Sequence, residues 1–162
     1  MEPHLLEECA AEIAKRNYKI AFIESATAGR MCAEFAMTSH SGSIIRGGLV
    51  CYSVFVKEQF LKVPHKLIEV QTPESQEVTD LLAKNGAKLF NSDITVAVTG
   101  LTTAGGSETA SKPVGTMFLS INIHAELISH RGVFKGTPQE IIHQTINKAA
   151  ELILKHLART DL

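Results

Sequence analysis

Short apolar runs alternate with segments of helical periodicity along most of this chain, and that alternation limits the folds it can adopt. Five strands are expected, at 18–25, 44–52, 93–100, 114–123 and 126–134. The last two follow one another closely enough to predict an antiparallel hairpin. We therefore expect a single α/β domain over residues 1–162, with three α/β/α layers and a mixed, mostly parallel sheet.

Helical patterns occupy the segments between and around these strands. The expected helices span 5–17, 31–36 and 73–90, with short pieces at 57–61 and 64–70 and a long final helix after residue 137. Thr137, Pro138 and Glu140 form a capping box at the start of that final helix. The Gly47–Gly48 pair in the second strand predicts a bulge or a close approach of another backbone.

Charge and composition exclude several classes of function. The formal net charge of -1 at pH 7 provides no basic stripe, so we expect a small-molecule partner and no nucleic acid. No run approaches 18 apolar residues and the N-terminus has no leader-like pattern, so we expect a cytoplasmic protein without a membrane segment. The 3 cysteines are widely spaced within apolar patterns, which suggests neither a disulfide framework nor a metal site. Neither a Walker A loop nor a GxGxxG dinucleotide fingerprint is present. No metal and no cofactor is expected.

Three loops that follow strands could carry the chemistry, because ligands of open α/β sheets gather outside the carboxyl ends of the strands. These loops are 24–29, 52–57 and 99–112. In the first loop, Ser25 or Thr27 stands where a strand passes into a helix, and either residue could simply cap that helix. Alternatively, one of the two hydroxyls points at a substrate, and amides at the helix N-terminus stabilise an oxyanion.

A serine nucleophile needs a base, and Lys57 in the second loop is the candidate. Burial would have to lower its pKa from about 10.4 to roughly 7 to 8; otherwise Lys57 is a solvated helix residue. Gly105 and Gly106 in the third loop are either phosphate-binding residues or turn residues. Arg46 and Lys112 are the nearest candidate anion partners, each with an ordinary surface role as the alternative.

Taken together, the segments ESATAG, RGGLVCYS followed by Lys57, and VTGLTTAGGSETASKPVGT resemble the C-terminal domain of the CinA (competence/damage-inducible protein) family. The similarity runs from the first expected helix to the last. Family members with known activity are nicotinamide mononucleotide deamidases. The resemblance therefore implies hydrolysis of the nicotinamide carboxamide to give nicotinate mononucleotide and ammonia.

The resemblance also implies roles for individual residues. The nucleophilic serine of the family falls on Ser25 and its lysine base on Lys57, with Tyr52 matching a family tyrosine. Thr27 and the amides near Gly29 would fix the nucleophile or hold the oxyanion. The residues expected toward the ribose-phosphate end are Thr99, Gly100, Gly105 and Gly106, with Arg46 as a further substrate-binding candidate. No metal is implied, and a homodimer is expected.

The chain departs from the family pattern at several positions. Ala28 stands where the family has a glycine, and its methyl group lies where the backbone could either approach the substrate or need a positive φ. An apolar segment, 54–56, replaces a polar one before Lys57, and this change either helps to lower the lysine pKa or removes polar contacts to the substrate. Pro138 and Ile142 occupy positions where family members often have arginine, which weakens the case for tight phosphate binding.

Three hypotheses about function follow. The first is a Ser/Lys amidohydrolase acting on nicotinamide mononucleotide or a close relative. The second is a divergent, catalytically weak family member that binds a nucleotide or a protein partner. The third is a structural or dimerisation module, because family chains often carry this domain behind a separate N-terminal domain.

Overall fold

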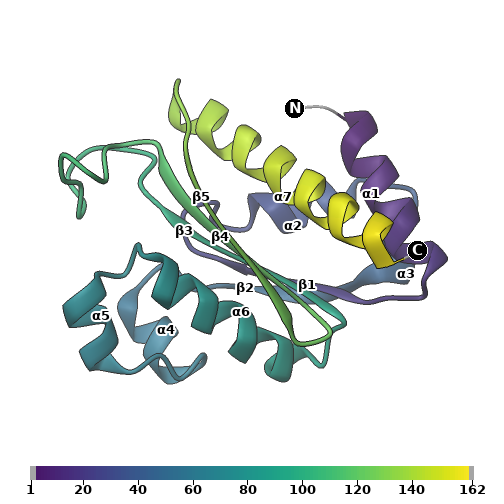
Figure 1. The fold of residues 1–162 in the computed structure, drawn as a ribbon, viewed down its shortest axis with the longest axis horizontal. Coiled ribbons are helices and arrows are strands. Elements are labelled where there is room, and N and C mark those ends of the chain that lie inside the picture. The colour runs from purple at the N-terminus through teal and green to yellow at the C-terminus, as the bar shows by residue number, and fades with distance from the viewer. Residues whose placement is uncertain (1–2, 161–162) are drawn as a thin grey trace.

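The computed structural model describes residues 3–160, and Figure 1 shows them as a twisted sheet between two layers of helices. The strands are β1 (Ile20–Glu24), β2 (Ile45–Val50), β3 (Ile94–Gly100), β4 (Thr116–Ile123) and β5 (Glu126–Val133). Their order is β2-β1-β3-β4-β5, with β1 parallel to β2 and β3, and with β4 antiparallel to β3 and β5. Because β4 alone runs against the other four, the expected mixed, mostly parallel sheet is confirmed.

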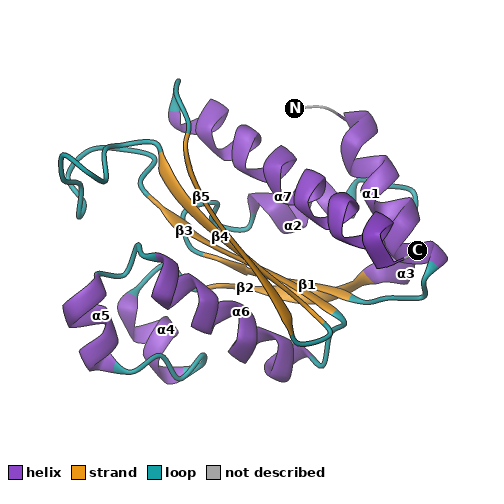
Figure 2. Ribbon diagram, in the orientation of Figure 1, coloured by secondary structure: helices purple, strands orange, loops and turns teal. Residues whose placement is uncertain are grey.

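Helices cover both faces of the sheet, which confirms the three-layer architecture (Figure 2). One face carries α1 (Pro3–Lys15), α2 (Arg30–Ala36), α3 (Ser41–Ile44) and α7 (Pro138–Thr160). The other face carries α4 (Val54–Gln59), α5 (His65–Gln71) and α6 (Gln76–Phe90). Within the described range, no helix combines the length and the apolar character needed to cross a membrane.

Alternating side chains of the strands build two hydrophobic cores, one on each face. Phe22 and Val96 belong to the core beneath α1, α2 and α7, whereas their neighbours Ile23 and Ala97 belong to the core beneath α6. All five residues of β1 are buried, as expected for a strand covered on both faces. In the sheet, β1 lies between β2 and β3, and the chain passes from β1 to β2 on one side before it returns to form β3 on the other side. The carboxyl ends of β1 and β3 therefore border the crevice where such sheets bind ligands.

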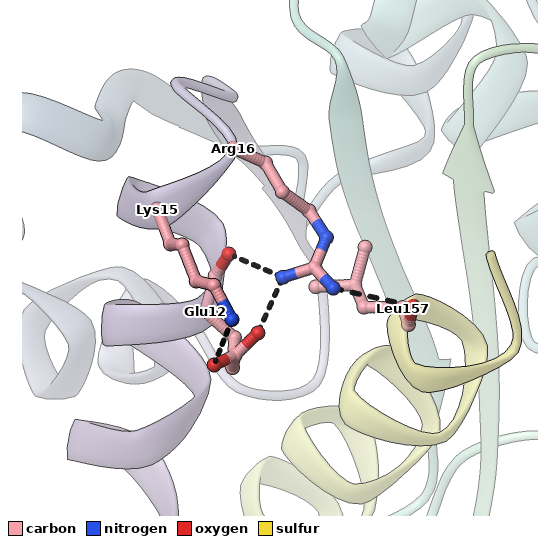
Figure 3. Close-up of polar contacts among 4 residues, drawn as sticks. All are labelled: Glu12, Lys15, Arg16 and Leu157. Atoms are coloured by element: carbon pink, nitrogen blue, oxygen red, sulfur yellow. Dashed lines mark hydrogen bonds and ion pairs between the residues drawn. The ribbon is translucent and has the colours of Figure 1, made fainter. Parts of the chain in front are cut away.

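A polar contact joins the first helix to the last, as Figure 3 shows. The Arg16 guanidinium donates to the carbonyl of Glu12 at 2.9 Å and to the carbonyl of Leu157 in α7 at 3.3 Å. The Glu12 carboxylate pairs with Arg16 and, at 3.6 Å, with Lys15. This contact holds α1 against α7, on the face of the sheet opposite to α4.

Two local features expected from the sequence are present. The Thr137 amide donates to the Glu140 carboxylate at 2.7 Å, and the Glu140 amide donates to Thr137 Oγ1 at 3.3 Å, which is the capping box of α7. In the pairing of β1 with β2, Ile20 lies opposite Ile45 but Ala21 lies opposite Gly47, so Arg46 is the extra residue of a bulge. A Cβ built on Gly48 would lie 3.1 Å from the Phe22 carbonyl oxygen, so the predicted close backbone approach is also confirmed.

Several expected boundaries are wrong, among them the following three. Ile44 belongs to α3 and not to the second strand. The helix expected over 73–90 begins at Gln76, because Ser75 caps it by accepting a hydrogen bond from the Val78 amide at 3.4 Å. The short helix expected over 57–61 begins earlier, at Val54, so Lys57 lies inside α4 and not where a loop passes into a helix. The second of these errors matters for the site, since it leaves residues 73 and 74 in a loop.

Close packing of α6 on the sheet gives a test of this architecture. A Cβ on Gly86 would lie 2.5 Å from Cγ1 of the buried Ile23, so Gly86→Val is expected to lower the free energy of unfolding by about 2 kcal/mol. Gly42→Val in α3 is the control, because a Cβ there meets nothing within 4 Å. Urea unfolding measures both variants, and equal stability of Gly86→Val and wild type would contradict the packing described.

Candidate active site

Ser25 stands at the carboxyl end of β1, between two neighbouring parallel strands. Its amide donates to the Val98 carbonyl of β3 over 3.0 Å, and the backbone then turns toward α2. Ala28 has a φ of 49° and Gly29 a φ of 93°, so the expectation of a positive φ at Ala28 is confirmed. The turn keeps Ser25 at the edge of the sheet, where its residual exposure is 7%.

Lys57 reaches Ser25 from α4. Its Nζ lies 3.0 Å from Ser25 Oγ, 2.6 Å from the Cys51 carbonyl oxygen and 3.2 Å from the Tyr52 carbonyl oxygen. An ammonium group would donate to all three oxygens. A neutral amine would donate to the two carbonyls and use its lone pair to accept the Ser25 proton. The second arrangement is that of a general base beside its nucleophile.

Burial is the main influence on the protonation of Lys57. The side chain is 1% exposed, and this desolvation lowers its pKa below the ordinary value of 10.5. Cys51 and the Glu74 carboxylate act in the opposite direction and raise the lysine pKa. Burial also raises the pKa of the Cys51 thiol to about 11, so this thiol carries its proton at pH 7. The net effect is a lowered Lys57 pKa, which is the direction that a base working near neutral pH requires.

The carboxylate of Glu24 organises the turn that presents Ser25. It accepts hydrogen bonds from the Thr27 hydroxyl and, at 2.8 to 3.1 Å, from the amides of Gly29, Met31 and Cys32. The expectation that Ser25 or Thr27 caps α2 is therefore wrong, because Thr27 donates to Glu24 and the N-cap residue, Gly29, has no side-chain cap. An acidic group at a helix N-terminus is also favoured by the helix dipole. Sequence reasoning missed Glu24, although a charged residue closing a buried strand was the available signal.

A pocket of about 210 Å³ opens beside Ser25, and loops from three parallel strands contribute to it. The predicted site residues that line this pocket are Ser25, Tyr52, Gly100, Gly105 and Gly106. Ala26, Glu74 and the segment 101–104 line it as well and were missed. Tyr52 is 71% exposed, so its ring stands at the rim.

Besides Lys57 and Lys112, four of the predicted site residues lie outside the pocket lining. Thr27 and Gly29 are occupied by their hydrogen bonds to Glu24. Thr99 is fully buried, and its hydroxyl lies 2.8 Å from that of Thr79 on α6. Arg46 is an exposed residue at the start of β2, toward the opposite edge of the sheet. Within residues 3–160, no group of three or more histidine, cysteine, aspartate or glutamate side chains could hold a metal ion.

The loop after β3 is held by hydrogen bonds to its own and neighbouring side chains. The amides of Gly105 and Gly106 donate to the two oxygens of Glu108, at 2.7 and 2.8 Å. The Lys112 ammonium donates to Thr72 Oγ1 at 2.7 Å, to Ser107 Oγ at 2.8 Å and to the Glu74 carbonyl at 3.0 Å. Lys112 therefore fastens this loop to the segment before α6 and does not line the pocket.

Removal of the Lys57 amine should change how stability depends on pH. Because folding lowers the Lys57 pKa, the unfolded chain binds this proton more tightly than the folded chain. The free energy of unfolding of wild type should therefore rise, relative to that of Lys57→Met, as the pH increases from the lowered pKa to about 10.5. Urea unfolding across this range measures the difference, with Lys66→Met on the exposed surface of α5 as control. A pH-independent difference between wild type and Lys57→Met would contradict the assigned environment.

Comparison with known proteins identifies the family. The CinA C-terminal domain family matches residues 2–157. A putative competence-damage inducible protein of Listeria welshimeri is 35% identical over 160 residues, covering 99% of this chain and 38% of the relative. A protein of the same description from Geobacillus kaustophilus is 29% identical over 155 residues, covering 95% of this chain and 37% of the relative. This chain thus spans less than two fifths of the length of these relatives.

Solved structures show the same fold. A competence-damaged protein (CinA) superfamily member from Klebsiella pneumoniae superposes with a TM-score of 0.92 at 22% identity, covering 97% of this chain and 98% of that one. The competence/damage inducible protein CihA from Agrobacterium tumefaciens gives 0.86 at 24% identity, covering 95% and 96%. At these identities the likeness concerns the fold alone. The family match over nearly the whole sequence shows more, namely that this chain belongs to the CinA C-terminal domain family.

Proposed function

We propose that this domain is a Ser/Lys amidohydrolase, and that it converts nicotinamide mononucleotide to nicotinate mononucleotide and ammonia. The observation that carries the proposal is the 3.0 Å contact between Lys57 Nζ and Ser25 Oγ, with the lysine buried and its pKa lowered. A serine hydroxyl with a neutral amine in hydrogen-bond contact is an activated nucleophile. The adjacent pocket gives a small carboxamide access to it.

The reaction takes place in two steps. In the first, Lys57 accepts the Ser25 proton while Oγ forms a bond to the carboxamide carbon, and the same proton then passes to the departing nitrogen as the C–N bond breaks. Ammonia leaves, and the substrate acyl group remains as an ester on Ser25. In the second step Lys57 takes a proton from water, the hydroxide attacks the ester carbon, and the returned proton restores the serine.

Backbone amides next to Ser25 are suited to stabilise the oxyanion. The amides at the start of α2 are bound to Glu24 and cannot serve. Ala26 lines the pocket, and its amide makes no hydrogen bond within the described residues. A donor at the residue after the nucleophile is well placed for the charge that develops during attack. Tyr52 at the rim offers an aromatic face to the pyridine ring.

Substitution of the two central residues tests the proposal. Ser25→Ala and Lys57→Met are each expected to reduce kcat/KM for ammonia release from nicotinamide mononucleotide by at least about 1000-fold, because each removes a group that takes part in bond making. The matched controls are Ser43→Ala and Lys66→Met, which change exposed residues away from the pocket and should stay within about twofold of wild type. Absence of ammonia release by wild type at high enzyme concentration would instead favour a domain that binds without turnover.

The pH dependence of the reaction provides a second test. Only the neutral amine of Lys57 can accept the serine proton, so kcat/KM should rise with pH and level off at the lowered pKa of Lys57, below the ordinary 10.5. Steady-state rates measured across this range report that pKa in the unliganded enzyme. A rate that rises only near 10.5 would mean that Lys57 is charged at neutral pH and is not the base.

A further inference from the structure

We propose that a second pocket, at the opposite end of the sheet from Ser25, binds an adenine mononucleotide. This pocket has a volume of about 460 Å³ and lies where α6 ends and where β4 turns into β5 (Figure 1). Its volume is within the range of roughly 300 to 1,000 Å³ that is usual for small-molecule sites. The second pocket is separate from the proposed hydrolysis, because neither Ser25 nor Lys57 lines it.

The inner wall of the second pocket carries a buried amide without a partner. Asn122 is 7% exposed, and among residues 3–160 its side chain makes no hydrogen bond. It shares a face of β4 with Ser120, whose hydroxyl donates to Asp80 on α6, so the Asn122 side chain points from the sheet toward the α6 layer. A side chain buried to this degree normally has a hydrogen-bond partner. The Asn122 amide is therefore available to a ligand, with a donor and an acceptor side by side.

Two lysines bring positive charge to the outer part of the second pocket. Lys84 and Lys88 are exposed, lie four residues apart on one side of α6, and form no ion pair within the described residues. No carboxylate stands among the described residues of the lining, and the nearby Asp80 lies outside it and accepts three hydrogen bonds from other side chains. At the end of α6, the Ala87 carbonyl already accepts from the amides of the two residues that follow the helix. The lining therefore attracts an anionic group.

An aromatic ring forms a further part of the wall. His124 lines the second pocket, and its ring packs edge-on against the Tyr18 ring, with the centroids 4.5 Å apart and the planes at 80°. The Asp93 carboxylate lies 3.9 Å from His124 Nδ1. These two contacts hold the imidazole beside the cavity. Histidine is one of the side chains on which nucleobases stack.

An adenine mononucleotide matches all three features of the second pocket. An asparagine amide pairs with adenine by accepting from N6 and donating to N7. The His124 ring provides a surface for the base, and the ammonium groups of Lys84 and Lys88 suit a phosphate. Inorganic phosphate would use the lysines alone, whereas adenosine would use Asn122 and His124 alone. Both parts should therefore bind more weakly than the whole nucleotide.

Titrations with adenosine monophosphate, adenosine and inorganic phosphate test the site without requiring turnover. The signal is the ¹⁵N-labelled side-chain amide of Asn122, identified by its loss in Asn122→Leu. The nucleotide should shift this signal in a saturable manner and bind about tenfold more tightly than adenosine. Added salt should weaken the binding of the nucleotide more than that of adenosine. Absence of a saturable shift, or an affinity for either part equal to that for the nucleotide, would overturn the proposal.

A charge-matched pair of double variants tests the role of the lysines. Lys84→Gln with Lys88→Gln should reduce the affinity for adenosine monophosphate by about tenfold and leave that for adenosine within about twofold. Lys66→Gln with Lys155→Gln removes the same charge from exposed positions on α5 and α7 and should retain wild-type affinity for the nucleotide. An equal loss in both double variants would show general charge attraction only and would contradict the assigned site.

Two further variants test the amide and the location. Asn122→Leu has a side chain of similar size and should weaken both the nucleotide and adenosine by about tenfold, as followed on the His124 backbone amide signal. Tyr52→Ala, at the rim of the pocket beside Ser25, should leave the titration of the Asn122 signal unchanged. Wild-type affinity in Asn122→Leu, or loss of the Asn122 shift in Tyr52→Ala, would overturn the proposal.

Discussion

The Glu24 carboxylate fixes the turn on which the rest of the site depends. By accepting the Thr27 hydroxyl and three amides at the start of α2, it converts the end of a buried strand into a tight strand-to-helix connection. That connection places Ser25 at the carboxyl edge of the sheet. The parallel neighbours of β1 end at the same edge, where β2 leads to α4 and β3 leads to the loop that lines the pocket. Ala28 adopts a left-handed φ in the same turn, at a cost of roughly 1 to 2 kcal/mol that the surrounding hydrogen bonds offset.

Three glutamates and one buried lysine determine the electrostatics of the site. Glu24 and Glu108 occupy backbone amides that would otherwise attract anions, whereas Glu74 lines the pocket. Lys57 is buried against two carbonyl oxygens and Ser25, so hydration that would stabilise its charged form is lost. Ser25 therefore lies beside a lysine whose pKa is lowered by burial, which is the arrangement that the proposed reaction requires.

Periodicity and loop position predicted the layers, the terminal hairpin and the three loops that meet at the site, because buried strands and amphipathic helices leave strong local patterns. Loop position made Lys57 a candidate partner of Ser25 and family resemblance supported it, but no local pattern joins the two residues, since 32 positions separate them. Glu74 was missed because the helix was expected to begin at residue 73, before the Ser75 cap. Thr99 and Arg46 were assigned to the site from motifs alone. In the structure the Thr99 side chain faces Thr79 on α6, and Arg46 lies at the bulge in β2, so neither reaches the pocket.

The central claim is that Lys57 is neutral enough at working pH to accept the Ser25 proton. The most direct measurement is an NMR titration of the Lys57 side chain in protein labelled with ¹³C at lysine Cε, with Lys57→Met used to assign the resonance. This resonance is expected to titrate below the ordinary value of 10.5, in the direction that burial requires. Titration of Lys57 at 10.5 or above, together with the exposed lysines, would contradict it.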